Sequence, residues 1–378
     1  MKRIALVALT LAALSLAACG GKYKAPPAQA TIALKTGADL KPYDPAKPGN
    51  AYPQGLAQVG DKVYASLSNQ RIDPSSGYPV IAGPGFLVAF VPSTGAQTLI
   101  DLGGSDGKQC QDPGFVRDSN AKLYVPCAGD FSGSDNGRAL VEVDPGTAQV
   151  TRRAAIPNGL VPNGVAPGLT KIWMGDSFTL RVFSVDRATF VADDPAKALT
   201  LTCPQTPSTG YSYVADVAIL FGDLYALCAS DSAGVLFRFD AATGAAKGSV
   251  AVGPTPSELT ATGDGRIAVI NSGDNTLSLV TINGATLTAD NHALTFPSGT
   301  ATLQDVRARD NFLFTVASGS NSAQKIDLSA KGGPKIIQAA SFPNGSNPYN
   351  IFPLDDDQAI VTNRQTNSIS AAQWVNIP

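Results

Sequence analysis

The sequence predicts an all-β fold, a seven-bladed β-propeller of four-stranded blades that an N-terminal strand closes. Three observations lead to this prediction. A strand–turn–strand phrase recurs along the chain, for example "NSGDNTLSLVTI" at 271–282 and "GDSFTLRVFSVD" at 175–186. The chain has 37 glycines and 27 prolines but only 15% charged residues, which favours short strands and many turns. The last repeat also lacks a strand that an isolated early segment can supply.

The recurring phrase defines the blade period. Its second strand begins with a short apolar run, and the anchor residues of successive runs lie 43 to 60 positions apart. A period of about 40–50 residues with several short strands per unit is typical of a propeller. Each run follows another apolar strand and a tight turn that contains Gly, Asp or Asn, as in a β-hairpin. The anchors are Val63, Leu123, Ile172, Leu224, Ile267, Leu313 and Ile360.

A third strand follows each phrase, from "FLVAFV" (86–91) in the first unit to "ISAAQW" (369–374) in the last. A fourth, more polar strand closes most units, as in "QTLIDL" (97–102), but none follows in the last unit. The early segment "ATIALKTG" (30–37) has strand character and no partner nearby. We expect residues 31–37 to complete the seventh blade, because an unclosed ring would expose sheet edges and apolar faces.

Two of these segments resemble the YVTN-type β-propeller repeat, whose usual form is a "YVTN-small-N-T-V-S-V-ID" phrase. They are "AVINSGDNTLSLVTI" (268–282) and "AIVTNRQTNSISAAQ" (359–373), and "PNGVAPGLTKIWMGDS" (162–177) is similar to the strand pair before that phrase. The resemblance covers about residues 53–378, and the first two units depart from it through long inserts at 69–85 and 129–138. It implies a propeller but no single function, because the family includes binding proteins and enzyme-like members.

The first 18 residues resemble a bacterial lipoprotein signal peptide. A short positive segment precedes the apolar run 4–18, which is too short to span a membrane comfortably. The run ends in "LAAC", which places Cys19 where the lipobox cysteine is acylated. By the family's sorting rule, Gly20 in place of Asp favours the outer membrane. We expect a signal peptide at 1–18, a tether at 19–30 and the propeller at 31–378; the alternative is an ordinary signal peptide with an incidental cysteine.

Composition excludes several functions. The formal net charge is −2 and no run of Lys and Arg occurs, so we expect no nucleic-acid partner. The single histidine, His292, excludes a multi-histidine metal site, and we expect it at the surface or between blades. Two tryptophans are too few for the docking motif that quinoprotein propellers repeat in each blade. No "CxxCH" or "GxxxxGK[ST]" motif occurs, and we predict no cofactor.

Polar residues recur where each innermost strand begins, at the mouth of the central channel. Carboxylates and amides are ligands for hard cations, so a ligand or a divalent cation such as calcium is one interpretation. The other is a wet, polar channel whose carboxylates cap turns, and we favour it. Asp130, Asp135 and Asp176 give a weaker calcium signal, since "DFSGSDNG" lacks the EF-hand spacing. The channel candidates are Asn163, Asp216, Glu258, Asp305 and Asn350.

Four cysteines besides Cys19 allow three pairings by number alone. In the repeat frame, Cys127 and Cys228 each end a second strand, while Cys110 and Cys203 each precede the first strand of the same blade. Because the same relation occurs twice, we predict the bridges Cys110–Cys127 and Cys203–Cys228. Both would lie at the face where the innermost strands begin.

The leading functional hypothesis is non-enzymatic: a lipid-anchored envelope propeller that binds or scaffolds another envelope protein or a glycan. The insert at 69–85 supports this hypothesis, because it and its flank carry more apolar residues than a solvated loop requires, and an exposed cluster would mark a partner site. The alternative is a metal-dependent hydrolase or lactonase with a carboxylate-lined channel. The apolar residues are Ile72, Tyr78, Val80, Ile81 and Phe86.

Overall fold

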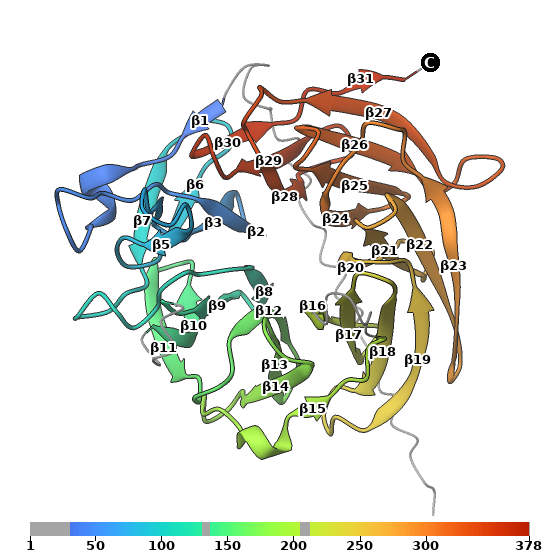
Figure 1. The fold of residues 1–378 in the computed structure, drawn as a ribbon, viewed down its shortest axis with the longest axis horizontal. Helices are drawn as coiled ribbons and strands as arrows, with labels where there is room; N and C mark the ends of the chain where they lie inside the picture. Colours follow the sequence, from blue (N-terminus) through green and yellow to red (C-terminus); the bar gives the residue numbers. More distant parts are fainter. Residues whose placement is uncertain (1–30, 131–136, 205–211, 378) are drawn as a thin grey trace, which may run out of the picture.

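Seven antiparallel sheets stand around a central axis as the blades of a propeller, with the first strand of each blade innermost (Figure 1). The computed structural model describes residues 31–130, 137–204 and 212–377. The expected signal peptide, Cys19, the tether and Asp135 lie outside the described residues. In the described part of the chain, no helix is long and apolar enough to cross a membrane.

The blades follow one another in chain order, from the innermost strand outward in each. Blade 1 comprises β2 (Pro53–Val59), β3 (Lys62–Leu67), β6 (Phe86–Phe90) and β7 (Gln97–Asp101). Blade 2 comprises β8 (Arg117–Ser119), β9 (Lys122–Ala128), β10 (Arg138–Asp144) and β11 (Gln149–Ala155). Blade 3 comprises β12 (Pro162–Pro167), β13 (Lys171–Asp176), β14 (Arg181–Asp186) and β15 (Leu199–Thr200). Blades 4 and 5 comprise β16 (Ser212–Leu220), β17 (Asp223–Ser230), β18 (Gly234–Asp240) and β19 (Ala246–Val252); and β20 (Pro256–Ala261), β21 (Ile267–Asn271), β22 (Thr276–Asn283) and β23 (Thr286–Thr295). Blades 6 and 7 comprise β24 (Leu303–Arg309), β25 (Phe312–Ala317), β26 (Ser322–Asp327) and β27 (Lys335–Ser341); and β28 (Pro348–Pro353), β29 (Ala359–Asn363), β30 (Ser368–Ala371) and β1 (Thr31–Ala33).

The hydrophobic core is divided among the seven interfaces between neighbouring blades. Each interface holds one cluster of buried apolar side chains, contributed by the facing sides of two sheets. Side chains alternate between the two faces of a strand, and both faces of the second and third strands of most blades are apolar and buried. A single blade therefore cannot bury its own apolar faces, and the ring must close for all of them to be covered.

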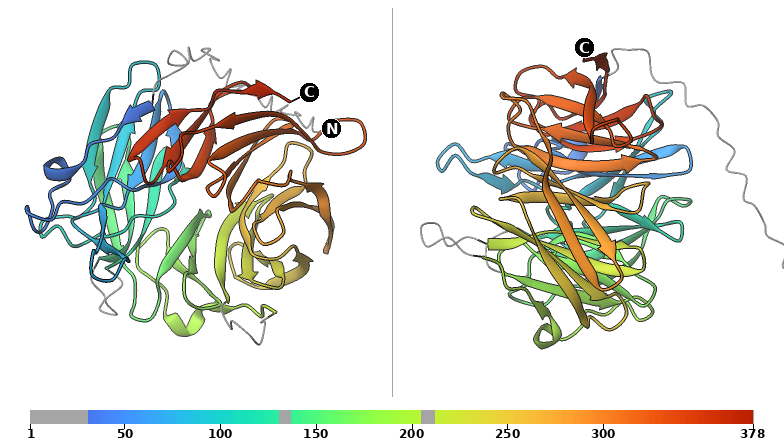
Figure 2. Two further views of the ribbon diagram at one scale, coloured as in Figure 1. Left: turned by 45° about the horizontal axis from the view of Figure 1, so that its top comes forward. Right: turned by 90° about the vertical axis from the view of Figure 1, so that its right-hand side faces the viewer.

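The N-terminal strand closes the ring, as predicted. β1 pairs antiparallel with β30, with Thr31 opposite Ser370, and so becomes the outer strand of blade 7. The N-terminal strands accordingly lie beside the C-terminal ones in both Figure 1 and Figure 2. The strand is shorter than the expected 31–37, because the chain turns into a 3-10 helix, η1 (Gly37–Leu40). Leu34 and Leu40 then pack into the cluster between blades 7 and 1.

The C-terminal segment differs from the expectation that the third strand of the last unit runs to Trp374. β30 ends at Ala371, and Val375–Asn376 form β31, which pairs with β27 as a fifth strand of blade 6. The ring of Trp374 lies 5.7 Å from that of Phe314. The apolar surface of the indole ring therefore draws the chain from blade 7 to the neighbouring blade.

The insert of blade 1 forms a small hairpin, β4 (Gln70–Ile72) and β5 (Pro79–Ile81), between β3 and β6. Ile72 and Tyr78 are 56% and 74% exposed, whereas Phe86 is buried in β6. A short 3-10 helix, η2 (Pro195–Lys197), interrupts the outer part of blade 3. We call the edge of the disc where the innermost strands begin the upper face; the hairpin lies there, because it follows the end of a second strand.

Replacing Leu40 with Ala tests the closing interface. Leu40 is fully buried, so Leu40→Ala should lower the free energy of unfolding by about 2–5 kcal/mol, measured in urea. The control Leu169→Ala, at a side chain that is 91% exposed, should change it by less than about 0.5 kcal/mol. Equal stability of the two variants would show that the N-terminal segment does not hold the ring closed.

Candidate functional site

A β-bulge recurs near the start of the innermost strands. In six of the seven blades the pairing register between the first and second strands shifts there, as between Val214 and Asp216 and between Leu303 and Asp305. A bulge re-aims the side chain that it contains. The repeated irregularity thus accounts for the ring of polar side chains that the sequence predicted at the channel mouth.

Three of the predicted channel residues join one blade to the next. Oδ2 of Asp305 accepts a hydrogen bond from the Ile351 amide at 2.8 Å, and Oδ1 of Asn350 accepts one from the Leu56 amide at 3.0 Å. Asp216 Oδ2 stands 3.4 Å from the Leu259 amide. Each contact satisfies an inward-facing backbone N–H of the following blade, and the Asn350 contact spans the closing interface between blades 7 and 1.

Two arginines meet the carboxylates inside the channel. Arg117 reaches from blade 2 toward blades 4 and 5. Its Nη2 lies 2.7 Å from Oε1 of Glu258 in blade 5 and 4.0 Å from Oδ1 of Asp216 in blade 4. Nη2 of Arg307 lies 2.8 Å from the same Glu258 oxygen, and its Nε lies 3.3 Å from Asp305. All three carboxylates are buried. The result is a five-residue cluster, the channel cluster, in which two positive charges face up to three negative ones.

Burial dominates the electrostatics of the channel cluster. It raises the pKa of Glu258 well above its ordinary range, and Asp305 raises that pKa further while Arg307 opposes the rise. Burial also raises the pKa of Asp216, against the attraction of Arg117 and Arg307. Oε2 of Glu258 has no hydrogen-bond partner among the described residues. A proton on Glu258 would leave the cluster with balanced charge.

The channel cluster offers a cation few free ligands. Oε1 of Glu258 pairs with two guanidiniums, and Oδ2 of Asp305 accepts from an amide N–H. Among the described residues, no group of three or more His, Cys, Asp or Glu side chains could hold a metal ion. The other candidates lie apart. Nδ2 of Asn163 stands 3.3 Å from the Val214 carbonyl of the next blade, and buried Asp176 accepts from Thr179 at 2.6 Å, which caps a turn. His292 is exposed on β23.

Both predicted disulfides are confirmed. Cys110–Cys127 and Cys203–Cys228 join residues whose Cα atoms lie 5.3 Å and 6.1 Å apart. Each bridge ties the segment before an innermost strand to the second strand of the same blade. The two bridges therefore fix connecting segments on the upper face of blades 2 and 4.

A pocket of about 220 Å³, the rim pocket, opens beside the blade 1 hairpin. Its lining comes from the hairpin, from the segment before β2 and from the turn after β29 in blade 7. Asp130 lines a separate cavity of about 260 Å³, to which Val80 and Ile81 of the hairpin also contribute. The residues of the rim pocket used below are Tyr52, Gln70, Arg71, Ile72, Arg364 and Gln365.

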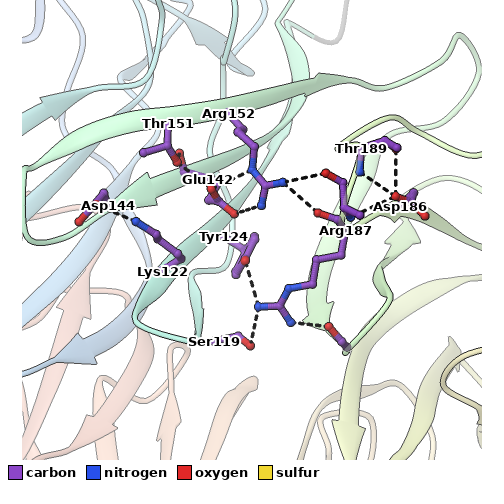
Figure 3. Close-up of polar contacts among 12 residues, drawn as sticks. Ser119, Lys122, Tyr124, Glu142, Asp144, Thr151, Arg152, Asp186, Arg187 and Thr189 are labelled. Atoms are coloured by element: carbon purple, nitrogen blue, oxygen red, sulfur yellow. Dashed lines mark hydrogen bonds and ion pairs between the residues drawn. The ribbon is translucent and has the colours of Figure 1, made fainter.

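A third polar cluster, between blades 2 and 3, is structural (Figure 3). Nη2 of Arg187 donates to Ser119 Oγ and Tyr124 Oη at 3.2 Å and 3.1 Å, and Nη1 of Arg152 donates to the Arg187 carbonyl at 2.9 Å. Nε of Arg152 donates to Glu142, which is buried. These groups satisfy one another across the blade interface, so the cluster leaves little to bind a ligand.

Sequence reasoning missed Arg117, Arg307 and the rim pocket. A signal for Arg307 was available: it follows Asp305 by two residues on a strand, and residues i and i+2 face the same side. No local pattern indicated that Arg117 crosses the channel, because its partners lie in blades 4 and 5. Arg364 was equally hidden, since Tyr52 lies more than 300 residues away in the chain.

Comparison with known proteins supports the fold alone. No family model matches the chain, and no curated protein matches it in sequence. Virginiamycin B lyase from Staphylococcus aureus is 13% identical with a TM-score of 0.61, over 85% of this chain and 95% of that one. A candidate 6-phosphogluconolactonase from Bacteroides fragilis is 14% identical with a TM-score of 0.62, over 85% and 95%. Hydrazine synthase from Kuenenia stuttgartiensis is 12% identical with a TM-score of 0.60, over 86% and 96%. The fold and the site define a seven-bladed propeller with a charge-filled channel.

The pH dependence of stability tests the channel cluster. Because the folded-state pKa of Glu258 is raised, the stabilisation from its protonated form is complete below the ordinary pKa of about 4.3 and is lost as pH rises through the raised value. The melting temperature of Glu258→Gln should therefore rise relative to the wild type as pH increases from about 4.

The other glutamate of the chain supplies a control of opposite sign. Although burial opposes it, hydrogen bonds from Arg152 and Thr151 lower the pKa of Glu142. Its stabilisation is present above the ordinary pKa and lost as pH falls. Glu142→Gln should thus be less stable than the wild type at neutral pH, and the difference should shrink in acid. Parallel pH profiles for the two variants would contradict the electrostatic account.

Proposed function

We propose that the chain is a lipid-anchored binding protein of the bacterial cell envelope, a YVTN-type propeller that presents its upper face to a glycan or to another envelope protein. The observation that carries the proposal is the use of the channel carboxylates. Asp216 and Asp305 accept hydrogen bonds from neighbouring blades. These two carboxylates and Glu258 also form ion pairs with arginines. Carboxylates that hold neighbouring blades together are unavailable for a reaction.

The hairpin of blade 1 supplies a recognition surface. It places Ile72 and Tyr78 in solvent, and Ile72 lines the rim pocket together with polar groups of blade 7. Exposed apolar and aromatic side chains beside unpaired polar groups are typical of binding sites. The hairpin is anchored by the Asn50–Gln70 bridge, so the surface is held in one orientation.

The second candidate is a hydrolase that uses the channel. Oε2 of Glu258 has no hydrogen-bond partner among the described residues, and burial raises the pKa of this carboxyl; both properties suit a general acid. Against this role, its other oxygen pairs with Arg117 and Arg307. We favour the binding function for that reason.

Metal removal separates the two candidates. In the binding protein the arginines neutralise the carboxylates, so a chelator should leave the melting temperature within about one degree and added calcium should not raise it. Sugar lactones should be hydrolysed no faster with the protein than without it. A chelator-induced drop of several degrees that calcium reverses, absent in Glu258→Gln, or lactone hydrolysis lost in that variant, would establish the hydrolase instead.

The proposed anchor is tested at Cys19. Cys19→Ser should abolish metabolic labelling with a radioactive fatty acid and move the protein from the membrane to the soluble fraction, because a serine cannot carry the thioether-linked lipid. The control Ser15→Ala, in the leader but outside "LAAC", should remain labelled and membrane-bound. Unchanged labelling of Cys19→Ser would refute the anchor.

A further inference from the structure

The rim pocket contains a guanidinium held in place with donors to spare. Arg364 lies directly over the ring of Tyr349, and its Cζ is 5.1 Å from the centroid of Tyr52. Nη2 donates to Oε1 of Gln54 at 2.7 Å. That bond uses one of five N–H groups. The Nε also lacks a hydrogen-bond partner among the described residues but is buried, so the remaining Nη N–H groups are the ones left for a ligand. Stacking on aromatic rings fixes the plane of a guanidinium, which prepares it to bind an oxyanion with two parallel hydrogen bonds.

A second arginine lines the same pocket. Arg71, in β4, also lines the rim pocket, and its side chain makes no hydrogen bond or ion pair to another described residue. The other arginines discussed above, in the channel and between blades 2 and 3, have carboxylate or carbonyl partners. Two guanidiniums at one cavity, neither in a close ion pair with a carboxylate of the described residues, leave N–H donors available to a ligand.

The nearby acids do not cancel this charge. The lining of the rim pocket contains no carboxylate. Asp112 lies beneath it and accepts hydrogen bonds from Gln54 and Gln70 at 2.9 Å and 2.6 Å, and burial raises its pKa and so disfavours its negative charge. Asp73 interacts with Arg71, but hydrogen bonds from Ser75 contribute more to the lowered pKa of this carboxylate. One of them comes from Ser75 Oγ at 2.9 Å, within the same hairpin turn.

The rest of the lining fits a ring that carries hydroxyl groups. Gln365 is exposed and Gln70 is held by Asp112, so amide groups border the cavity next to Tyr52 and the exposed Ile72. Amides donate to and accept from hydroxyls, and aromatic and aliphatic surfaces cover the apolar face of a sugar ring. The volume of about 220 Å³ suits one monosaccharide unit better than a folded partner.

We propose that the rim pocket binds a carboxylate-bearing sugar, with Arg364 and Arg71 on the carboxylate and the amides on the hydroxyls. The proposal rests on the binding function above and specifies its ligand as a uronic acid, free or at the end of a glycan. Glucuronic acid is the probe, titrated by calorimetry at low salt, with glucose as the neutral match and acetate as the bare carboxylate.

Glucuronate should bind saturably, at least about tenfold more tightly than glucose or acetate, because either compound lacks half of the recognised groups. Arg364→Gln and Arg71→Gln should each weaken glucuronate binding roughly tenfold or more. Arg364→Lys should not restore it, since an ammonium lacks the planar fork. The control Arg309→Gln, at a partly buried arginine of β24 whose ion pair with Asp356 lies outside the rim pocket, should bind as the wild type does. Melting temperatures verify that each variant is folded. Arg71→Gln removes the electrostatic attraction to Asp73 but no hydrogen bond or close ion pair to another described residue.

A comparison of glucuronic acid with an oligosaccharide that ends in it shows whether the ligand is a free uronic acid or the end of a glycan. A glycan site should bind the oligosaccharide more tightly. Absence of glucuronate binding, equal affinity for acetate, or affinity unchanged in both arginine variants would overturn the proposal. So would an acidic peptide that binds through the same arginines where the sugar acid does not. These results differ from the one that would contradict the broader binding function, which is lactone hydrolysis that depends on Glu258.

Discussion

The burial of apolar side chains between neighbouring blades is the constraint on which the rest of the structure depends. Every blade has two apolar faces, so each needs a neighbour on both sides, and a linear stack would leave two faces in water. Closure through β1 and β30 covers the last pair with Leu34, Leu40 and the facing strands of blades 7 and 1. The central channel follows from this geometry, because seven blades around an axis bring their first strands near one another without filling the space between them.

The channel must then accommodate polar backbone on its inner wall, and the charged residues there serve that need. Asp305 and Asn350 satisfy amide groups of the following blade, which places carboxylates where water is scarce. Arg117 and Arg307 offset the resulting charge. On the function proposed here, ligand recognition takes place at the rim instead of the axis, where the hairpin of blade 1 meets blade 7 and Arg71 and Arg364 line one pocket.

The repeat period, the strand order and the closing strand could be predicted from the sequence, because each depends on spacing that recurs. The two disulfides could be predicted for the same reason, since Cys127 and Cys228 occupy equivalent positions in two blades. Contacts across the ring could not: Arg117 finds Glu258 three blades away, and Arg364 stacks on Tyr52 at the opposite end of the chain. The move of Trp374 to blade 6 depended on the shape of the neighbouring sheet, which local strand propensity does not encode.

The short ladder between β1 and β30 also has a mechanical meaning. Any pull on the chain before Thr31 reaches the propeller through this ladder, which spans Thr31 to Ala33 opposite Ser368 to Ser370. The force would act first on the three residue pairs and on the packing of Leu34, before it reaches any other blade. A protein tethered at that end would thus unfold first at the β1–β30 pairing. The interface between blades 7 and 1 would open while the other six interfaces stay intact.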